Sequence, residues 1–164
     1  INNFYKMHTL VVGLNYKTTQ VDNREKMYFS ASELEVALPT LNSYPHISEC
    51  VILSTCNRIE IYAASENPED AYKSIIQFLS DFHKIPVENF INLIYKKRCD
   101  DALKHLFDVT SSLNSMILGE YEILGQVKDA YDKAKNLNIT KEFFNKLFQM
   151  AIVVGKRNAE RSRA

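Results

Sequence analysis

The residues best suited to chemistry lie in the segment from Ser54 to Tyr62, which reads Ser-Thr-Cys-Asn-Arg-Ile-Glu-Ile-Tyr. An apolar run, Val51–Leu53, brings Cys56 to the edge of a polar cluster, and a strand-like alternation follows. A thiolate attacks acyl groups readily, but a free cysteine has a pKa near ~8.5 and needs help to ionise at neutral pH. A cysteine beside a buried strand can also be a small core residue. Cys56 alone does not decide between these two interpretations.

Arg58 is the first candidate partner for this cysteine. If the strand continues through Cys56, residues 56 and 58 point to the same side. Arg58 then either lowers the pKa of the thiol or binds a substrate carboxylate through two parallel hydrogen bonds. The alternative is that Arg58 forms a surface ion pair with Glu60.

A second group of polar residues lies at the start of a helix expected after Gly119. At about 100° per residue, the apolar face of this helix is made of Leu124, Val127, Tyr131 and Ala134. Glu120 falls in the middle of that face, whereas Glu122 and Gln126 fall on the opposite, polar side. An acid on an apolar face needs a partner or a shifted pKa, unless it stays solvated in the first turn, where it suits the helix dipole.

His105 occupies a different position on its own helix. One side of that helix is defined by Leu103, Leu106, Phe107 and Thr110, and His105 lies roughly opposite. We therefore predict that His105 is not a core residue. The simplest expectation is an exposed side chain that pairs with Asp101, one turn earlier.

Size and composition indicate an ordered globular protein. The chain has 164 residues, 46% of them hydrophobic and 24% charged, enough for one domain or a domain with a helical extension. No apolar stretch approaches the ~20 residues of a membrane span, so we expect no membrane association. Basic and acidic residues number 20 each, so any nucleic-acid contact must use a local patch such as Lys96–Arg98.

The cysteines indicate a reducing environment. Cys50, Cys56 and Cys99 are odd in number and show no paired short spacing, which argues against a disulfide framework and against a zinc site. We therefore expect no metal and a cytoplasmic protein.

The element pattern predicts an α+β fold. We expect a small antiparallel sheet with helices packed on it, in the order βα-ββ-αβ, followed by a helical segment from about residue 100. Strands are expected at residues 9–14, 49–54, 58–64 and 92–98. A capping box at Ser30–Glu33 begins one helix, which Pro39 is expected to kink or shorten, and Asn67-Pro68 begins another.

Four sequence blocks, in order, carry a resemblance to a known family. They are Gly13–Thr18 with Arg24-Glu25, Ser54–Arg58 with Glu60 and Tyr62, Leu113–Glu120 with Ile123–Val127, and Gly155–Arg157. Together they resemble the N-terminal catalytic domain of glutamyl-tRNA reductase, the NADPH-dependent enzyme that begins the five-carbon route to tetrapyrroles such as porphyrins. The chain departs from the usual family pattern at several positions. Asn114, where the family usually has Asp, removes a charge and can alter the electrostatics of the pocket.

The resemblance implies a mechanism and a set of site residues. Cys56 would attack the glutamyl-tRNA ester to form a thioester, which NADPH reduces to glutamate-1-semialdehyde. Arg58 would bind the glutamyl carboxylate, and His105 would act as a proton donor or a positioning group. The implied substrate-binding residues are Thr55, Asn57, Arg58, Ser115, Glu120, Tyr121, Glu122 and Gln126.

The resemblance also implies a domain plan. Residues 1–6 are expected to be an extension, natural or added for expression, residues 7–100 the α+β catalytic core with the nucleophile, and residues 101–164 a helical part that completes the substrate pocket. An NADPH-binding domain and a C-terminal domain that forms a homodimer would follow, and no Gly-x-Gly-x-x-Gly occurs in these residues. Two alternatives stay open: a thiol hydrolase or acyltransferase that uses no nicotinamide, and a non-catalytic regulatory domain that binds tRNA or a protein partner.

Overall fold

A four-stranded antiparallel sheet forms the centre of the protein. The computed structural model describes residues 6–111 and 122–163. The strands are β1 (His8–Asn15), β2 (Glu49–Ser54), β3 (Arg58–Ser65) and β4 (Tyr95–Arg98), and their order in the sheet is β2-β3-β1-β4. The α+β class predicted from the sequence is confirmed. β2 and β3 form a hairpin, and β1 lies between β3 and the edge strand β4.

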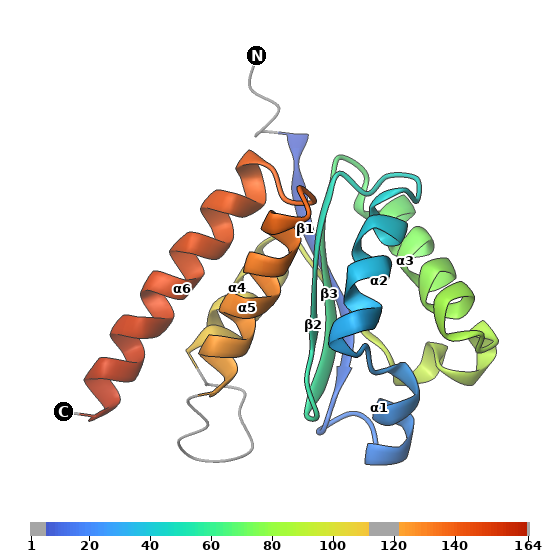
Figure 1. Ribbon diagram of the computed structural model, residues 1–164, viewed down its shortest axis with the longest axis horizontal. Helices are drawn as coiled ribbons and strands as arrows, with labels where there is room; N and C mark the ends of the chain where they lie inside the picture. The colour runs from blue at the N-terminus through green and yellow to red at the C-terminus, as the bar shows by residue number, and fades with distance from the viewer. Residues whose placement is uncertain (1–5, 112–121, 164) are drawn as a thin grey trace.

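Helices cover both faces of this sheet (Figure 1). One layer consists of α1 (Val21–Met27), α2 (Ala31–Asn42) and α3 (Pro68–His83). The other consists of α4 (Asp100–Thr110), α5 (Glu122–Asn136) and α6 (Glu142–Arg163). Two 3₁₀ turns, η2 (Val87–Asn89) and η3 (Ile91–Leu93), connect α3 to β4. The helical segment thus packs on the second face of the sheet, and all eight residues of β3 are buried as a result.

Local signals explain where the helices of the first layer begin. Ser30 Oγ accepts a hydrogen bond from Glu33 N at 3.1 Å, and Glu33 Oε1 accepts one from Ser30 N at 3.0 Å, which confirms the capping box. Asn67 caps α3 through Asp70 N, with Pro68 at the first helical position. α2 continues past Pro39 to Asn42. α1 has no side-chain cap, and the sequence patterns did not predict it.

The second helical layer is fixed to the sheet by specific contacts. Glu49, on β2, is buried, and its carboxylate accepts hydrogen bonds from Lys141 N and from Phe144 N, the latter at 3.1 Å, at the start of α6. Tyr62 of β3 packs edge-on against Phe148 of α6, with 5.7 Å between ring centroids. None of the helices in the described ranges combines the length and apolar character that a membrane span needs.

Candidate active site

Cys56 lies at the tip of the β2–β3 hairpin. Thr55 N donates to Arg58 O at 2.8 Å, and Thr55 Oγ1 accepts hydrogen bonds from Asn57 N and Arg58 N, both at 3.1 Å. The strands end at Ser54 and resume at Arg58, close to the predicted bounds, because the threonine hydroxyl satisfies two backbone amides and closes a tight turn. The condition under which residues 56 and 58 would point to the same side of one strand is therefore not met. Cys56 is exposed on the turn, whereas the Arg58 side chain is only 3% exposed.

Two contacts from outside the hairpin hold this turn. Tyr16 N, just after β1, donates to Asn57 O at 2.9 Å. Arg24, on α1, donates from Nε to Cys56 O at 3.1 Å and from Nη1 to Thr19 O at 2.6 Å. The arginine thus bridges the cysteine's own carbonyl and the loop that follows β1. Arg24 lies in the first of the four sequence blocks, but its residue type and spacing give no sign of this contact, because the two carbonyls meet it only in the folded chain.

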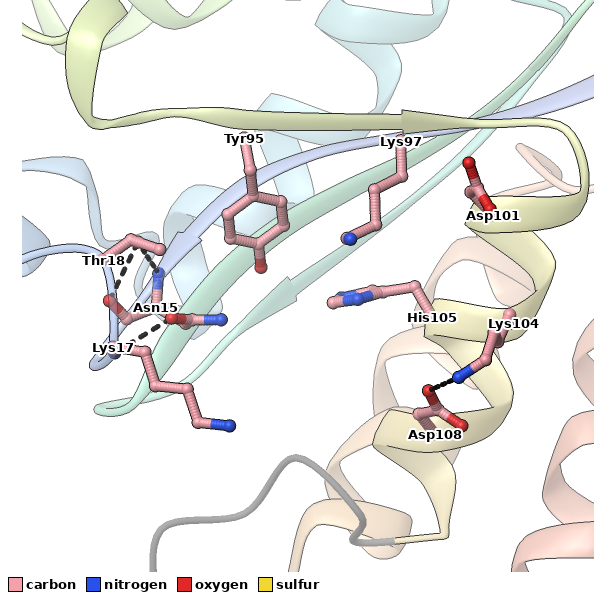
Figure 2. A pocket seen from close by; sticks show the side chains of 9 residues that line it. All are labelled: Asn15, Lys17, Thr18, Tyr95, Lys97, Asp101, Lys104, His105 and Asp108. Atoms are coloured by element: carbon pink, nitrogen blue, oxygen red, sulfur yellow. Dashed lines mark hydrogen bonds and ion pairs between the residues drawn. The ribbon is translucent and has the colours of Figure 1, made fainter.

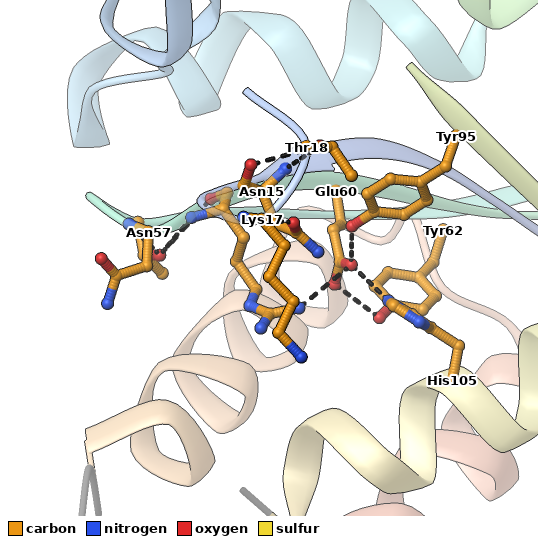
Figure 3. Close-up of polar contacts among 10 residues, drawn as sticks. Asn15, Lys17, Thr18, Asn57, Glu60, Tyr62, Tyr95 and His105 are labelled. Carbon is orange, nitrogen blue, oxygen red and sulfur yellow. Dashed lines mark hydrogen bonds and ion pairs between the residues drawn. The ribbon is translucent and has the colours of Figure 1, made fainter. Parts of the chain in front are cut away.

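A buried carboxylate, Glu60, lies two residues beyond Arg58 and is fully buried. It accepts hydrogen bonds from Arg58 Nη1 at 3.3 Å and from Tyr62 OH at 2.8 Å, and it also contacts Tyr95 OH and His105 Nε2 (Figure 3). We call these five residues the Glu60 cluster. It joins β3, β4 and α4 through side chains alone.

The charges within the Glu60 cluster support one protonation pattern. Burial raises the pKa of Glu60, but the hydrogen bond and charge of His105 and the charge of Arg58 outweigh it, so the pKa is lowered overall. Burial, followed by the nearby carboxylate, raises the pKa values of Tyr62 and Tyr95 well above their usual value. At neutral pH the cluster therefore contains an ionised carboxylate and two neutral phenols that donate to it.

The position predicted for His105 is wrong. Its side chain is only 6% exposed, and its partner is Glu60 rather than Asp101. The buried residues of α4 are Ala102, His105, Leu106, Val109 and Thr110, whereas Leu103 is only partly buried. The alternative considered for Arg58, a pair with Glu60, does form, but it is buried rather than on the surface because the helical layer covers β3.

The substrate-binding residues predicted beyond residue 110 fall only in part within the described chain. Ser115, Glu120 and Tyr121 lie outside the described residues. Glu122 is exposed on the first turn of α5. Gln126, one turn later, is half-buried, and its Oε1 is shielded from solvent without a hydrogen-bond partner among residues 6–111 and 122–163. The structure therefore turns Gln126 partly inward, unlike the fully polar face expected from the helical wheel.

A pocket of about 340 Å³ adjoins the Glu60 cluster (Figure 2). His105 and Tyr95 form part of its wall. The remaining lining residues are Asn15, Lys17, Thr18, Lys97, Asp101, Lys104 and Asp108. This pocket could not be predicted from the sequence, because residues from β1, β4 and α4 meet there only in the folded chain. Alternation along β4 was the one available signal, since it places Tyr95 and Lys97 on the same face.

The remaining cysteines differ from Cys56 in position. Cys50 is a buried residue of β2, and burial raises the pKa of its thiol. Cys99 is exposed, between β4 and α4. Among the described residues, no group of three or more His, Cys, Asp and Glu side chains is placed to hold a metal ion.

Comparisons with known proteins agree on one family. The family model described as "Glutamyl-tRNAGlu reductase, N-terminal domain" matches residues 12–162. Glutamyl-tRNA reductases from Pelotomaculum thermopropionicum and Oceanobacillus iheyensis are 49% and 47% identical over 151 residues, which is 92% of this chain and 34% and 33% of theirs. The solved glutamyl-tRNA reductase from Methanopyrus kandleri has a TM-score of 0.76 and 34% identity, over 93% of this chain and 34% of that one. The chain thus spans about a third of the length of these relatives.

Proposed function

Because this chain belongs to the glutamyl-tRNA reductase family, with the N-terminal domain as the matched part, we propose that it accepts the glutamyl group from glutamyl-tRNA on Cys56. The observation that supports this most directly is the exposed thiol on a turn whose backbone is held by Arg24 and Tyr16. A nucleophile needs both access and a fixed position. Cys56 has both, whereas Cys50 is buried. Cys99 is also exposed, and its amide donates to Thr9 O at 2.8 Å, but it lies outside the four sequence blocks that resemble the family.

The proposed reaction is an acyl transfer from oxygen to sulfur. The Cys56 thiolate attacks the ester carbonyl, a carbon–sulfur bond forms, and the bond to the ribose oxygen breaks. The ribose hydroxyl leaves with a proton. An aminoacyl ester is already activated, so the step needs no ATP. The resulting thioester has a more electrophilic carbonyl than the ester and is the better acceptor for hydride.

We propose that the Glu60 cluster orients the groups around this reaction. Arg58 would bind the glutamyl carboxylate, and Glu60 would keep its guanidinium in one orientation. His105, held by the same carboxylate at the pocket wall, would donate a proton or position the substrate. The roles of Thr55, Asn57 and Gln126 in substrate binding remain predictions, together with those of Ser115, Glu120, Tyr121 and Glu122.

The reduction itself would require NADPH. None of the four glycines of this chain forms a Gly-x-Gly-x-x-Gly phosphate loop, so these residues do not fit a dinucleotide site. We propose that a separate domain of the full protein holds the NADPH, which supplies the hydride that releases glutamate-1-semialdehyde. Homodimer formation through another domain is also proposed, as is a cytoplasmic location, where Cys56 would stay a free thiol.

Mass spectrometry after incubation with glutamyl-tRNA tests the proposal. The wild-type chain is expected to gain the mass of one glutamyl group, or to release glutamate from the tRNA, and Cys56→Ser is expected to do neither. Cys99→Ser is the matched control, because Cys99 is also an exposed free thiol. Equal adduct or equal release in Cys56→Ser and the wild type would disprove the proposal. Release of glutamate without NADPH, together with no reduced product when the complete enzyme is given NADPH, would instead indicate the thiol hydrolase.

A further inference from the structure

The pocket beside the Glu60 cluster carries two lysines for which the described part of the chain offers no ion-pair partner. Three lysines and two aspartates line it. Lys104 pairs with Asp108 at 2.8 Å, whereas neither Lys17 nor Lys97 forms an ion pair within residues 6–111 and 122–163. Asp101 is the remaining acid of the pocket. The pocket therefore presents more unpaired positive charge than negative charge.

The edge strand β4 separates its basic residues by face. Lys96 and Arg98 lie on the side of α3, where both pair with Glu69, and Lys96 also lies 4.4 Å from the Tyr72 ring centroid. Lys97 lies on the other side, and Figure 2 shows it reaching from β4 toward His105. The neighbouring lysines thus differ in what they can bind, although their exposure is similar. The ammonium group of Lys96 is already occupied by Glu69 and the Tyr72 ring, so it is less available to a ligand than that of Lys97.

Lys17 connects this pocket to the nucleophile. It follows Tyr16, whose amide donates to Asn57 O at 2.9 Å in the turn that carries Cys56. Asn15, also in the pocket wall, pairs with Arg58 across the β1–β3 ladder. In Figure 3 Lys17 lies between Asn57 and His105. The residue before Lys17 is thus hydrogen-bonded to the turn that carries Cys56.

We propose that Lys17 and Lys97 bind the phosphate of the terminal nucleotide of the acyl-tRNA, an inference that rests on the proposed function. In such an ester only one ribose separates the reacting oxygen from the nearest phosphate, so a substrate at Cys56 brings that phosphate close to Lys17. The ammonium group of a lysine is a point charge on a flexible stem and can bind a phosphate from several directions. The planar guanidinium of an arginine is better suited to a carboxylate held in one orientation. The volume of about 340 Å³ is within the usual range for small-ligand sites.

Binding of an RNA hairpin that has the acceptor-end sequence of the tRNA but carries no amino acid tests the proposal. Lys17→Gln and Lys97→Gln are each expected to weaken binding about fourfold at 0.15 M salt, and to reduce the slope of log affinity against log salt by about 0.7. Lys96→Gln is the matched control on the same strand and is expected to change neither quantity. Equal losses in Lys96→Gln and Lys97→Gln, or no loss in Lys17→Gln and Lys97→Gln, would overturn the proposal.

A second substrate separates phosphate binding from binding of the glutamyl group. A small glutamyl thioester that lacks a nucleotide serves as the probe, and acylation of Cys56 is followed by mass spectrometry. The ratio of the rate with glutamyl-tRNA to the rate with the small thioester is expected to fall about fourfold in each lysine variant. An unchanged ratio with both rates reduced would place the lysines at the glutamyl carboxylate and refute the phosphate site. Failure of the proposed function would look different: the wild type would bind the RNA hairpin in a lysine-dependent way, and neither substrate would acylate Cys56.

Discussion

Cys56 and Glu60 are four residues apart in the chain, and their surroundings differ in nearly every physical respect. Cys56 is exposed, and the contacts that fix its position are hydrogen bonds to the backbone of the turn. Glu60 is fully buried, and its contacts are side chains with charged or polar groups. Charge interactions are stronger in the buried environment, where water does not screen them. Cys56 is thus accessible to other molecules, whereas the charged groups four residues away are held in one orientation.

The largest expected effect is a difference in the free energy of unfolding between a variant at Glu60 and a variant at Cys56. Glu60→Ala leaves Arg58 buried without its carboxylate partner, so it is expected to lower the free energy of unfolding by about 3 to 5 kcal/mol. Cys56→Ser changes an exposed side chain and is expected to alter it by no more than about 0.5 kcal/mol. Urea denaturation followed by circular dichroism measures both. A loss for Cys56→Ser as large as that for Glu60→Ala would mean that the two regions are not independent.

Sequence alone could predict the parts of this comparison that depend on local chemistry. β2 begins and ends at the predicted residues, and the capping box of α2 involves the two predicted side chains. Such signals depend on residues three to eight positions apart. The four sequence blocks also identified the family, although they did not show how Cys56 is held.

The buried state of the Glu60 cluster could not be predicted in the same way. Alternation in β3 indicated one polar face, and an isolated strand with that pattern is half-exposed. That face is covered here by α4, α5 and α6, whose position depends on contacts such as Glu49 with the start of α6. His105 was misplaced for a related reason. Its helix has partly buried apolar residues beside the fully buried ones, so two different faces looked apolar in sequence.

Gly13 offers a way to disturb the Glu60 cluster from the neighbouring strand. A Cβ at Gly13 would lie 2.5 Å from Ile59 O and 2.9 Å from Glu60 Cγ. Gly13→Ala is therefore expected to lower the free energy of unfolding by about 1 to 3 kcal/mol, because a backbone carbonyl in a paired strand cannot move aside. The rate at which iodoacetamide alkylates Cys56 should change little in the same variant, since the turn is held by Tyr16 and Arg24 rather than by Gly13.

Gly125→Ala is the control for this substitution. Gly125 lies within α5, and a Cβ there meets no atom of the described residues within 4 Å. The alanine is expected to stabilise the protein by up to about 1 kcal/mol, because it favours the helix. Destabilisation by both variants to the same degree would show that the packing of Gly13 against Glu60 has no special importance.

The pH dependence of stability tests the charge state of the Glu60 cluster. Folding lowers the pKa of Glu60, so the unfolded chain binds more protons as the pH falls below about 4.5, the ordinary value for a glutamate. The stabilisation is therefore fully present above that pH, and it is lost as the pH falls through the folded-state pKa. In Glu60→Gln the slope of unfolding free energy against pH should be smaller below pH about 4.5, by at most about 1.4 kcal/mol per pH unit. Parallel curves for wild type and variant would contradict an ionised Glu60.

Arg24 is expected to give the smallest effect, and it acts on the exposed side of the comparison. Its guanidinium bridges Cys56 O and Thr19 O. Arg24→Gln removes both the bridge and the positive charge that contacts the Cys56 carbonyl. An exposed charge interaction contributes roughly 0.5 to 1 kcal/mol, so alkylation of Cys56 at pH 7 is expected to slow about threefold. Lys26→Gln, an exposed lysine on the same helix, is the control and should react at the wild-type rate.

Arg24→Lys distinguishes the two ways in which the arginine can act. A lysine keeps the charge but cannot present the planar fork that joins two carbonyls. If the charge matters most, Arg24→Lys should restore the wild-type alkylation rate across the pH range. If the bridge matters most, Arg24→Lys should react as slowly as Arg24→Gln, because the turn that carries Cys56 has lost its second point of attachment. The second result would mean that the exposed Cys56 owes its position to backbone contacts rather than to charge, in contrast to the buried Glu60.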